Sequence, residues 1–178
     1  MTEVALDIAT PHAPSVIRLL LGKLAISYNE VIDQPGLPAA RKVQAVLLDD
    51  AVGALMVLFP QSQLLDLNRL AELTGRRLTA VSTERLERML GKHSLSLLPG
   101  LPALTSSPCL YEESLLREPC LLINSGEPGV LLEITSEAFK SMLSKASAGN
   151  FGEPLSSIRP NLDLSLIHIS EPTRLLSI

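Results

Sequence analysis

The apolar positions along this chain follow two periodicities, one typical of helices and one typical of strands. An i, i+3, i+4 spacing occurs in three places, and side chains at that spacing lie on one side of a helix. The three sets are Leu67, Leu70 and Ala71; Leu86, Met89 and Leu90; and Phe139, Met142 and Leu143. We therefore predict three helices, each of which buries one apolar stripe.

Residues typical of helix ends flank these stripes. Gly75 follows the first stripe, where a glycine readily adopts the left-handed conformation that ends many helices. Ser82 and Thr135 precede the second and third stripes, and their hydroxyls are suited to cap the first backbone N–H groups. Glu84 and Glu137 place a carboxylate in each first turn, which the helix dipole favours. These residues set the expected ends of the predicted helices.

A fourth helix is predicted near the N-terminus, after a loose lead-in over residues 1–12. Pro14 and Ser15 are typical of a helix start. The apolar stripe that follows consists of Val16, Leu19, Leu20 and Leu24. We expect this stripe to face the core.

Short apolar runs predict the strands. Residues 43–48 and 54–59 flank a polar segment that ends in Gly53, which is typical of a hairpin. Further strands are predicted at residues 26–32, 78–81, 120–124 and 130–134. Strands and helices do not alternate regularly. The fold class is therefore α/β of the α+β type: a mixed, largely antiparallel sheet with helices packed against it.

The C-terminal part differs in composition. Residues 147–164 are rich in Ser, Gly, Pro and Asn, so we predict a linker after a domain of residues 1–146. Residues 165–178 resemble the translation of a sequencing adapter or vector read-through, and we predict a non-native tail there. The natural chain is then expected to continue into a further domain.

Composition narrows the class of protein. The chain has no Trp, two Tyr and three Phe, so its core must be mostly aliphatic. A formal net charge of -4 argues against a strongly basic nucleic-acid surface. Positive charge does gather over residues 76–92, and we favour a solvated helix face and turn for it. Apolar runs stay below the roughly 20 residues of a membrane span, and no signal peptide is evident. We therefore expect a cytoplasmic protein.

Few residues carry recognisable chemistry. His12 and His93 lack metal-ligand partners at suitable spacing, so no metal or other cofactor is predicted. Cys109 could act as a nucleophile with the distant His93, but a buried free thiol is the better interpretation for Cys109 and for Cys120.

Several stretches, taken in order, resemble one family. The LDLNRLA of residues 65–71 is similar to the family's LDLKKLA, and the YEESL of residues 111–115 is similar to its VDESL. The other matching stretches are residues 46–50, 53–60, 101–104 and 123–135. Over residues 13–146 the chain resembles the YbaK and prolyl-tRNA-synthetase-associated family of aminoacyl-tRNA deacylases.

The resemblance implies a pocket that holds the 3′ end of tRNA and hydrolyses a wrongly attached amino acid. The family's hallmark lysine falls on Gln44, which implies weakened or lost catalysis, because a neutral amide gives up the charge that stabilises developing negative charge. Lys42 lies two residues earlier, roughly 6.6 Å along a strand. It is either a partial substitute or a surface residue after Arg41.

The resemblance also implies pocket residues and a partner. Gly100, Pro102, Ser125 and Gly126 would bind the substrate, and aminoacyl-tRNA would be the partner. Two functions stay open: an editing-type domain with weak deacylase activity, and a non-enzymatic regulatory or sensory module of a bacterial signalling protein that continues into an HDOD domain.

Overall fold

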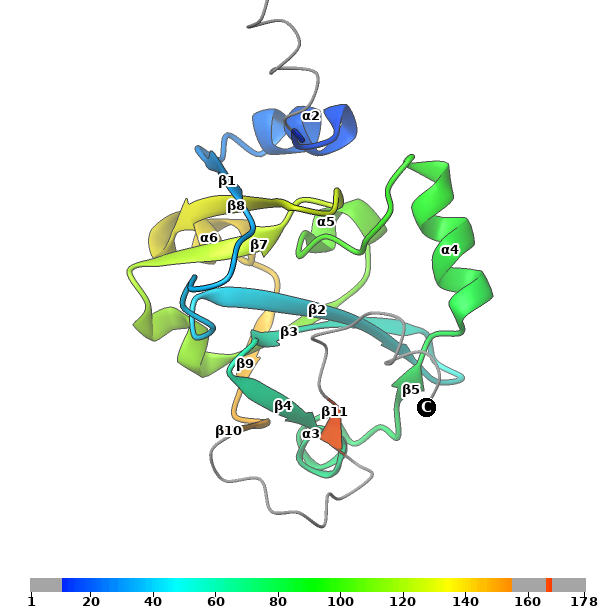
Figure 1. Ribbon diagram of the computed structural model, residues 1–178. Coiled ribbons are helices and arrows are strands. Elements are labelled where there is room, and N and C mark those ends of the chain that lie inside the picture. Colours follow the sequence, from blue (N-terminus) through cyan, green and yellow to red (C-terminus); the bar gives the residue numbers. More distant parts are fainter. Residues whose placement is uncertain (1–10, 155–165, 168–178) are drawn as a thin grey trace, which may run out of the picture.

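The fold is organised around a long strand, β2, which runs through the centre of a mixed sheet (Figure 1). The computed structural model describes residues 11–154 and the backbone of residues 166–167. The larger sheet has the order β1-β8-β7-β2-β3-β6-β9, and β5 also pairs with β2. A smaller sheet has the order β10-β4-β11.

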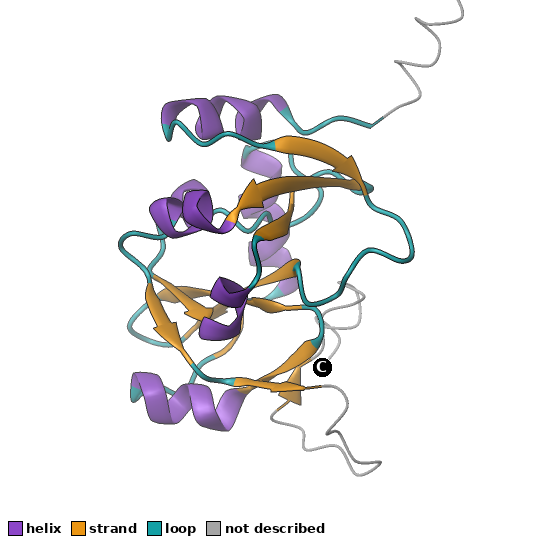
Figure 2. Cartoon of the chain, turned by 90° about the vertical axis from the view of Figure 1, so that its left-hand side faces the viewer, coloured by secondary structure: helices purple, strands orange, loops and turns teal. Residues whose placement is uncertain are grey.

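The strands are β1 (Asn29–Ile32), β2 (Lys42–Asp49), β3 (Ala54–Pro60), β4 (Gln63–Asp66), β5 (Thr79–Ala80), β6 (Cys109–Glu112), β7 (Cys120–Asn124), β8 (Val130–Thr135), β9 (Ser147–Gly149), β10 (Gly152–Pro154) and β11 (Leu166–Ile167). The helices are α2 (Ser15–Lys23), α3 (Leu67–Thr74), α4 (Thr83–Lys92), α5 (Pro102–Thr105), the 3-10 helix η1 (Glu113–Arg117) and α6 (Ser136–Met142). In the side view of Figure 2, helices lie both above and below the strands.

The predicted fold class is confirmed. In the larger sheet, β1–β8, β2–β3, β2–β5 and β7–β8 are antiparallel, whereas β2–β7, β3–β6 and β6–β9 are parallel. The hairpin of β2 and β3 and the helices α3, α4 and α6 lie where the apolar pattern predicts them. None of the described helices has the length and apolarity needed to cross a membrane.

The predicted helix ends are confirmed as well. Gly75 ends α3 in the left-handed region at φ 68°. The Ser82 hydroxyl accepts a hydrogen bond from the Arg85 N–H at 3.3 Å, and the Thr135 hydroxyl accepts one from the Ala138 N–H at 3.1 Å.

The predicted buried stripe of the first helix is wrong for Leu19 and Leu24, whereas Val16 and Leu20 are partly buried against the core. α2 buries Ile17 and Leu21, whereas Leu19 is 68% exposed and Leu24 is also exposed. α2 itself carries apolar side chains on most sides, so the periodicity did not define which side is buried. The strands predicted at residues 26–32 and 78–81 are also shorter in the structure, as β1 and β5.

The prediction of a linker from residue 147 is wrong for residues 147–154. β9 pairs with β6, β10 pairs with β4, and the intervening Phe151 is fully buried. Small residues fit here because the chain packs closely: a Cβ on Gly149 would lie 3.1 Å from Leu73 Cδ1. Of the predicted tail, Leu166–Ile167 form β11 against β4; residues 155–165 and 168–178 lie outside the described residues.

Two apolar clusters lie on opposite faces of the sheet, and β2 contributes to both. Val43 and Leu47 belong to the larger cluster, and Val46 and Leu48 belong to the smaller one. This division follows from the alternation of side chains along a strand.

Leu70 tests the packing of the smaller cluster. It is 1% exposed on α3, so Leu70→Ala is expected to lower the free energy of unfolding by about 2–5 kcal/mol through lost burial and a cavity. Leu73, on the same helix, is 53% exposed and serves as the control. Urea denaturation should show a cost of about 0.5 kcal/mol or less for Leu73→Ala. Equal costs for the two variants would contradict the assignment of the buried face.

Candidate functional site

The middle of β2 has an open edge. On one side β2 pairs with β3 along its whole length. On the other side β7 pairs only with Lys42 and Val43, and β5 pairs only with Leu48 and Asp49. Within the described residues, no strand therefore covers this edge between β7 and β5. Because ladder hydrogen bonds alternate in direction, the peptide groups of Ala45 point toward the opening.

A cavity of about 860 Å³ lies at this opening, a size typical of small-molecule sites. Its walls are β2, the side of α4 that carries Leu86 and Leu90, and the loop of residues 96–98. Aliphatic side chains form much of the lining. The lining residues that carry a charged or amide group are Asp33, Lys42, Gln44, Gln61, Glu87 and Asn124. An apolar cavity with a few polar groups can bind an amino-acid-sized group and orient its polar ends.

The two residues predicted as catalytic both line the cavity. The Lys42 Nζ lies 2.7 Å from Asp33 Oδ1, and the Lys42 side chain is 16% exposed. The ammonium is thereby held and its charge is offset. The side-chain amide of Gln44 makes no hydrogen bond to the described residues, so it is available to a ligand.

The four predicted substrate-binding residues are not among those that line the cavity. The Ser125 hydroxyl is fully buried and donates to the Val130 carbonyl at 2.8 Å. The Gly126 carbonyl accepts hydrogen bonds from the N–H groups of Ser96 and Leu97 at 3.0 and 3.2 Å. Gly126 thus holds the loop of residues 96–98 that forms one wall, whereas Ser125 stabilises the turn between β7 and β8.

Gly100 and Pro102 follow this loop in the chain. A Cβ on Gly100 would lie 2.9 Å from Ile123 Cγ2, so glycine permits the close approach of the loop to β7. Pro102 is the first residue of α5. Direct substrate binding by these four residues stays a prediction.

Several lining residues were not singled out from the sequence. Asp33 follows β1 and meets Lys42, Asn124 ends β7, and Glu87 projects from α4. Only the pairing of distant segments brings these side chains together. The placement of Asn124 at the end of a predicted strand was the one available signal.

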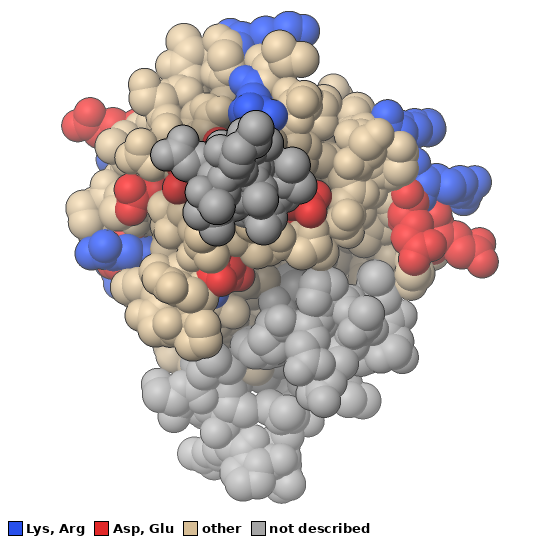
Figure 3. All heavy atoms as spheres, turned by 45° about the horizontal axis from the view of Figure 1, so that its top comes forward, with Lys and Arg blue, Asp and Glu red and all other residues tan. Residues whose placement is uncertain are grey.

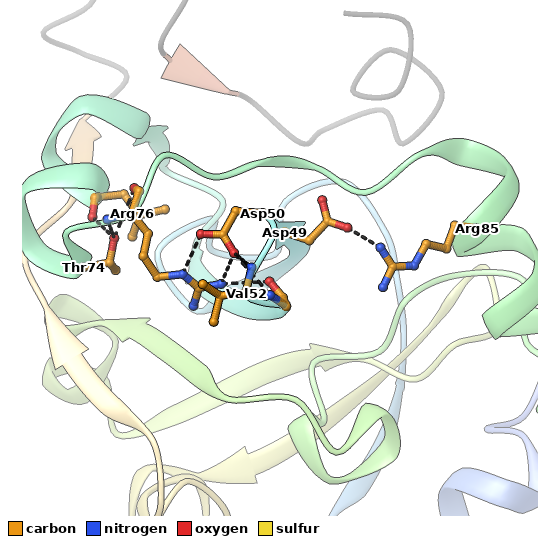
Figure 4. A network of polar contacts seen from close by, with 8 residues as sticks. Asp49, Asp50, Val52, Thr74, Arg76 and Arg85 are labelled. Atoms are coloured by element: carbon orange, nitrogen blue, oxygen red, sulfur yellow. Dashed lines mark hydrogen bonds and ion pairs between the residues drawn. The ribbon is translucent and has the colours of Figure 1, made fainter.

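Two neighbouring carboxylates fix the end of the β2–β3 hairpin. In Figure 4, Asp49 and Asp50 point in opposite directions, toward Arg85 of α4 and toward Arg76 after α3. The Arg76 guanidinium binds Asp50 through two hydrogen bonds of 2.6 and 2.9 Å, and it donates a third to the Gly53 carbonyl at 2.8 Å. Two of the clustered arginines therefore make ion pairs and are not merely a solvated face.

The Asp50–Arg76 pair predicts a pH dependence of stability. The hydrogen bond from Arg76, with further bonds from the N–H groups of Val52 and Gly53, holds the pKa of the Asp50 carboxyl far below its ordinary value of about 4. A lowered folded-state pKa stabilises the protein above the unfolded-state pKa and loses that contribution as the pH falls through the folded-state value.

We therefore expect Asp50→Asn to be less stable than wild type by a constant margin between pH 5 and pH 8, since the asparagine keeps the turn but not the charge. The margin should shrink as the pH falls below about 4. Urea denaturation of both proteins across this range measures it. A margin that is unchanged at pH 2.5 would show that the charge does not matter.

Cys109 does not have the properties of a nucleophile. It lies in β6 within the larger apolar cluster, and burial raises the pKa of its thiol to about 12. The thiol is therefore protonated at neutral pH, and a core thiol is the interpretation that the structure favours. No group of three potential metal ligands is found within the described residues.

The fold and cavity define an α+β domain with a cavity at the open edge of a central strand. Residues 25–142 match the model of the aminoacyl-tRNA editing domain, and the chain belongs to this family. The predicted family resemblance is therefore confirmed. A comparison with proteins of curated function found no match.

The solved structures that are similar to this chain include the following two. One is titled "Putative signal transduction protein", from Marinobacter aquaeolei VT8, with 26% identity and a TM-score of 0.77; the match covers 85% of this chain and 33% of that one. The other is titled "a putative trans-editing enzyme for prolyl tRNA synthetase", with 18% identity and a TM-score of 0.63 over 80% of this chain and 99% of that one. The chain thus spans about a third of the Marinobacter protein, and its likeness to the second structure shows the fold.

Proposed function

We propose that this domain binds the aminoacylated 3′ end of tRNA in the cavity beside β2 and has little or no deacylase activity. Membership of the editing family supports the substrate class, and the lining of the cavity supports the loss of activity. The observation that carries the proposal is that the cavity contains Gln44 at the lysine position and a Lys42 that is already paired with Asp33. Because aminoacyl-tRNA is used in translation, we propose that the protein acts in the cytoplasm.

The chemical argument concerns charge in the transition state. Hydrolysis of an ester builds negative charge on the carbonyl oxygen, and a positioned cation stabilises that charge. The neutral Gln44 amide can donate a hydrogen bond but supplies no charge. Lys42 would have to leave Asp33 before it could act on the ester. The substrate would therefore bind without rapid turnover.

Binding can be tested separately from catalysis. A panel of 3′-aminoacyl-adenosine analogues, in which an amide replaces the ester, is titrated into the wild type and followed by calorimetry. At least one analogue should bind, and Leu86→Trp, which fills the cavity from α4, should weaken its binding tenfold or more. Leu73→Trp, at an exposed position outside the lining, is the matched control. Failure of every analogue to bind the wild type would contradict the proposal.

A second candidate function is a non-enzymatic regulatory module, with the described domain as the sensory part of a longer signalling chain. Its support is the likeness to the Marinobacter protein, whose title names signal transduction. Ligand binding without turnover of any mischarged tRNA, in a natural chain that continues into an HDOD domain, favours this function. Measurable turnover of mischarged tRNA by the wild type favours editing.

A further inference from the structure

α4 separates two cavities, and its two sides differ in charge. The side that faces the first cavity carries Leu86, Glu87 and Leu90. The other side carries Arg85, Arg88 and Lys92, which line a second cavity of about 440 Å³. We call this second cavity the α4 groove; its further lining residues are Leu47, Ala54, Val81, Met89, Thr105 and Ser107.

The α4 groove has a net positive charge. No carboxylate lines it, but the Arg85 guanidinium pairs with the neighbouring Asp49. Arg88 donates through Nε to the Glu84 backbone carbonyl at 3.4 Å, and Lys92 has no ion-pair partner among the described residues. Arg88 and Lys92 therefore supply the uncompensated charge. In Figure 3, Lys and Arg side chains lie at the edge of the molecule that α4 forms in Figure 1, with Asp and Glu side chains beside them.

The groove adjoins the first cavity, because Leu47 and Val81 line both. The Val81 N–H donates to the Leu47 carbonyl at 3.0 Å, so these two residues and α4 form the partition between the cavities. A strand whose end lies in the first cavity therefore has to cross α4 to reach the groove. Arg88 and Lys92 are four residues apart on the helix, which places them about 6 Å apart along its axis. Cations in such a row can bind successive phosphates of a nucleic-acid strand.

We propose that the α4 groove binds the phosphates of the RNA strand whose 3′ end enters the first cavity, with Arg88 and Lys92 as the phosphate-binding side chains. This inference rests on the proposed function for the direction of the strand. The neighbouring cavity favours RNA over an acidic peptide, because a single RNA 3′ end that crosses α4 then reaches both sites.

The test uses the whole chain and an uncharged RNA hairpin with a short single-stranded 3′ end, followed by fluorescence anisotropy at several salt concentrations. Arg88→Ala/Lys92→Ala should weaken RNA binding on the order of tenfold at 0.1 M salt. It should also reduce the slope of log Kd against log salt by about 1.4, since each single-strand phosphate contact contributes about 0.7. Arg117→Ala/Lys140→Ala removes the same charge from exposed positions outside both cavities and should leave the slope unchanged.

A phosphate-free 3′-aminoacyl-adenosine analogue separates the two proposals, because it should bind wild type and both double variants equally. If the analogue binds but RNA affinity is the same in both double variants, the groove proposal is overturned and the proposed function stands. If RNA binding depends on Arg88 and Lys92 while no analogue binds, the groove proposal stands and the proposed function fails. If a polyglutamate peptide binds the wild type as tightly as the RNA and displaces it, the groove proposal is overturned in favour of an acidic peptide.

Discussion

Gln44→Lys is expected to raise the rate at which this domain deacylates mischarged tRNA by roughly 100-fold, the range that one positioned charge or donor contributes at such sites. The wild type should be slow. The measurement is a single-turnover assay of a panel of mischarged tRNAs, in which each tenfold gain corresponds to about 1.4 kcal/mol of transition-state stabilisation.

The position of residue 44 in the cavity explains the size of this effect. Gln44 is one of the lining residues, and its side-chain amide makes no hydrogen bond to the described residues, so we expect a lysine there to reach the ligand. Lys42, in contrast, has its Nζ 2.7 Å from Asp33 Oδ1. A lysine at position 44 is therefore not equivalent to the lysine already present at position 42.

Two control variants make this result specific. Gln44→Met keeps the length of the side chain without charge and should stay as slow as wild type. Lys42→Ala tests whether Lys42 already acts as the catalytic cation. A fast wild type that Lys42→Ala inactivates would assign that role to Lys42 and contradict the assignment of residue 44. Slow turnover in every variant would favour the regulatory function.

The parts of the fold that local sequence determines could be predicted. The stripe of α4 and its Ser82 cap, and the hairpin around Gly53, depend on residues a few positions apart. Helix periodicity, capping and turn chemistry act over that range. The first helix shows the limit of such local patterns. Because α2 carries apolar side chains on most sides, its sequence did not reveal that Ile17 and Leu21 face the core.

Of the candidate site, only the residues on β2 could be predicted from the sequence. The family resemblance placed Gln44 and Lys42 together, and the structure places both on the cavity wall. The open edge of β2 arises because β7 and β5 pair with opposite ends of that strand, and no local pattern encodes such pairing. The ion pair between Lys42 and Asp33 likewise depends on tertiary structure.

The segment around Phe151 shows how composition can mislead, because its Ser, Gly, Asn and Pro residues indicated a linker. Phe151 is expected to be essential to stability, and Phe151→Ala should lower the free energy of unfolding by about 3–5 kcal/mol. Its side chain is fully buried in the smaller apolar cluster, between β9 and β10. Urea denaturation measures the loss, and Asn150→Ala, at the exposed neighbouring position, is the control.

Glu112 provides a second test of how residues 147–154 pack against the rest of the domain. Its buried carboxylate accepts hydrogen bonds from the N–H groups of Phe151 and Gly152 at 2.7 and 2.8 Å. Removing the acceptor leaves these groups unpaired, so Glu112→Ala should cost about 1–3 kcal/mol. If Phe151→Ala already releases the segment, adding Glu112→Ala should cost much less than it does alone, because the two changes act on one contact surface. A cost below about 1 kcal/mol for Phe151→Ala, or full additivity of the two changes, would mean that residues 147–154 do not dock as one unit.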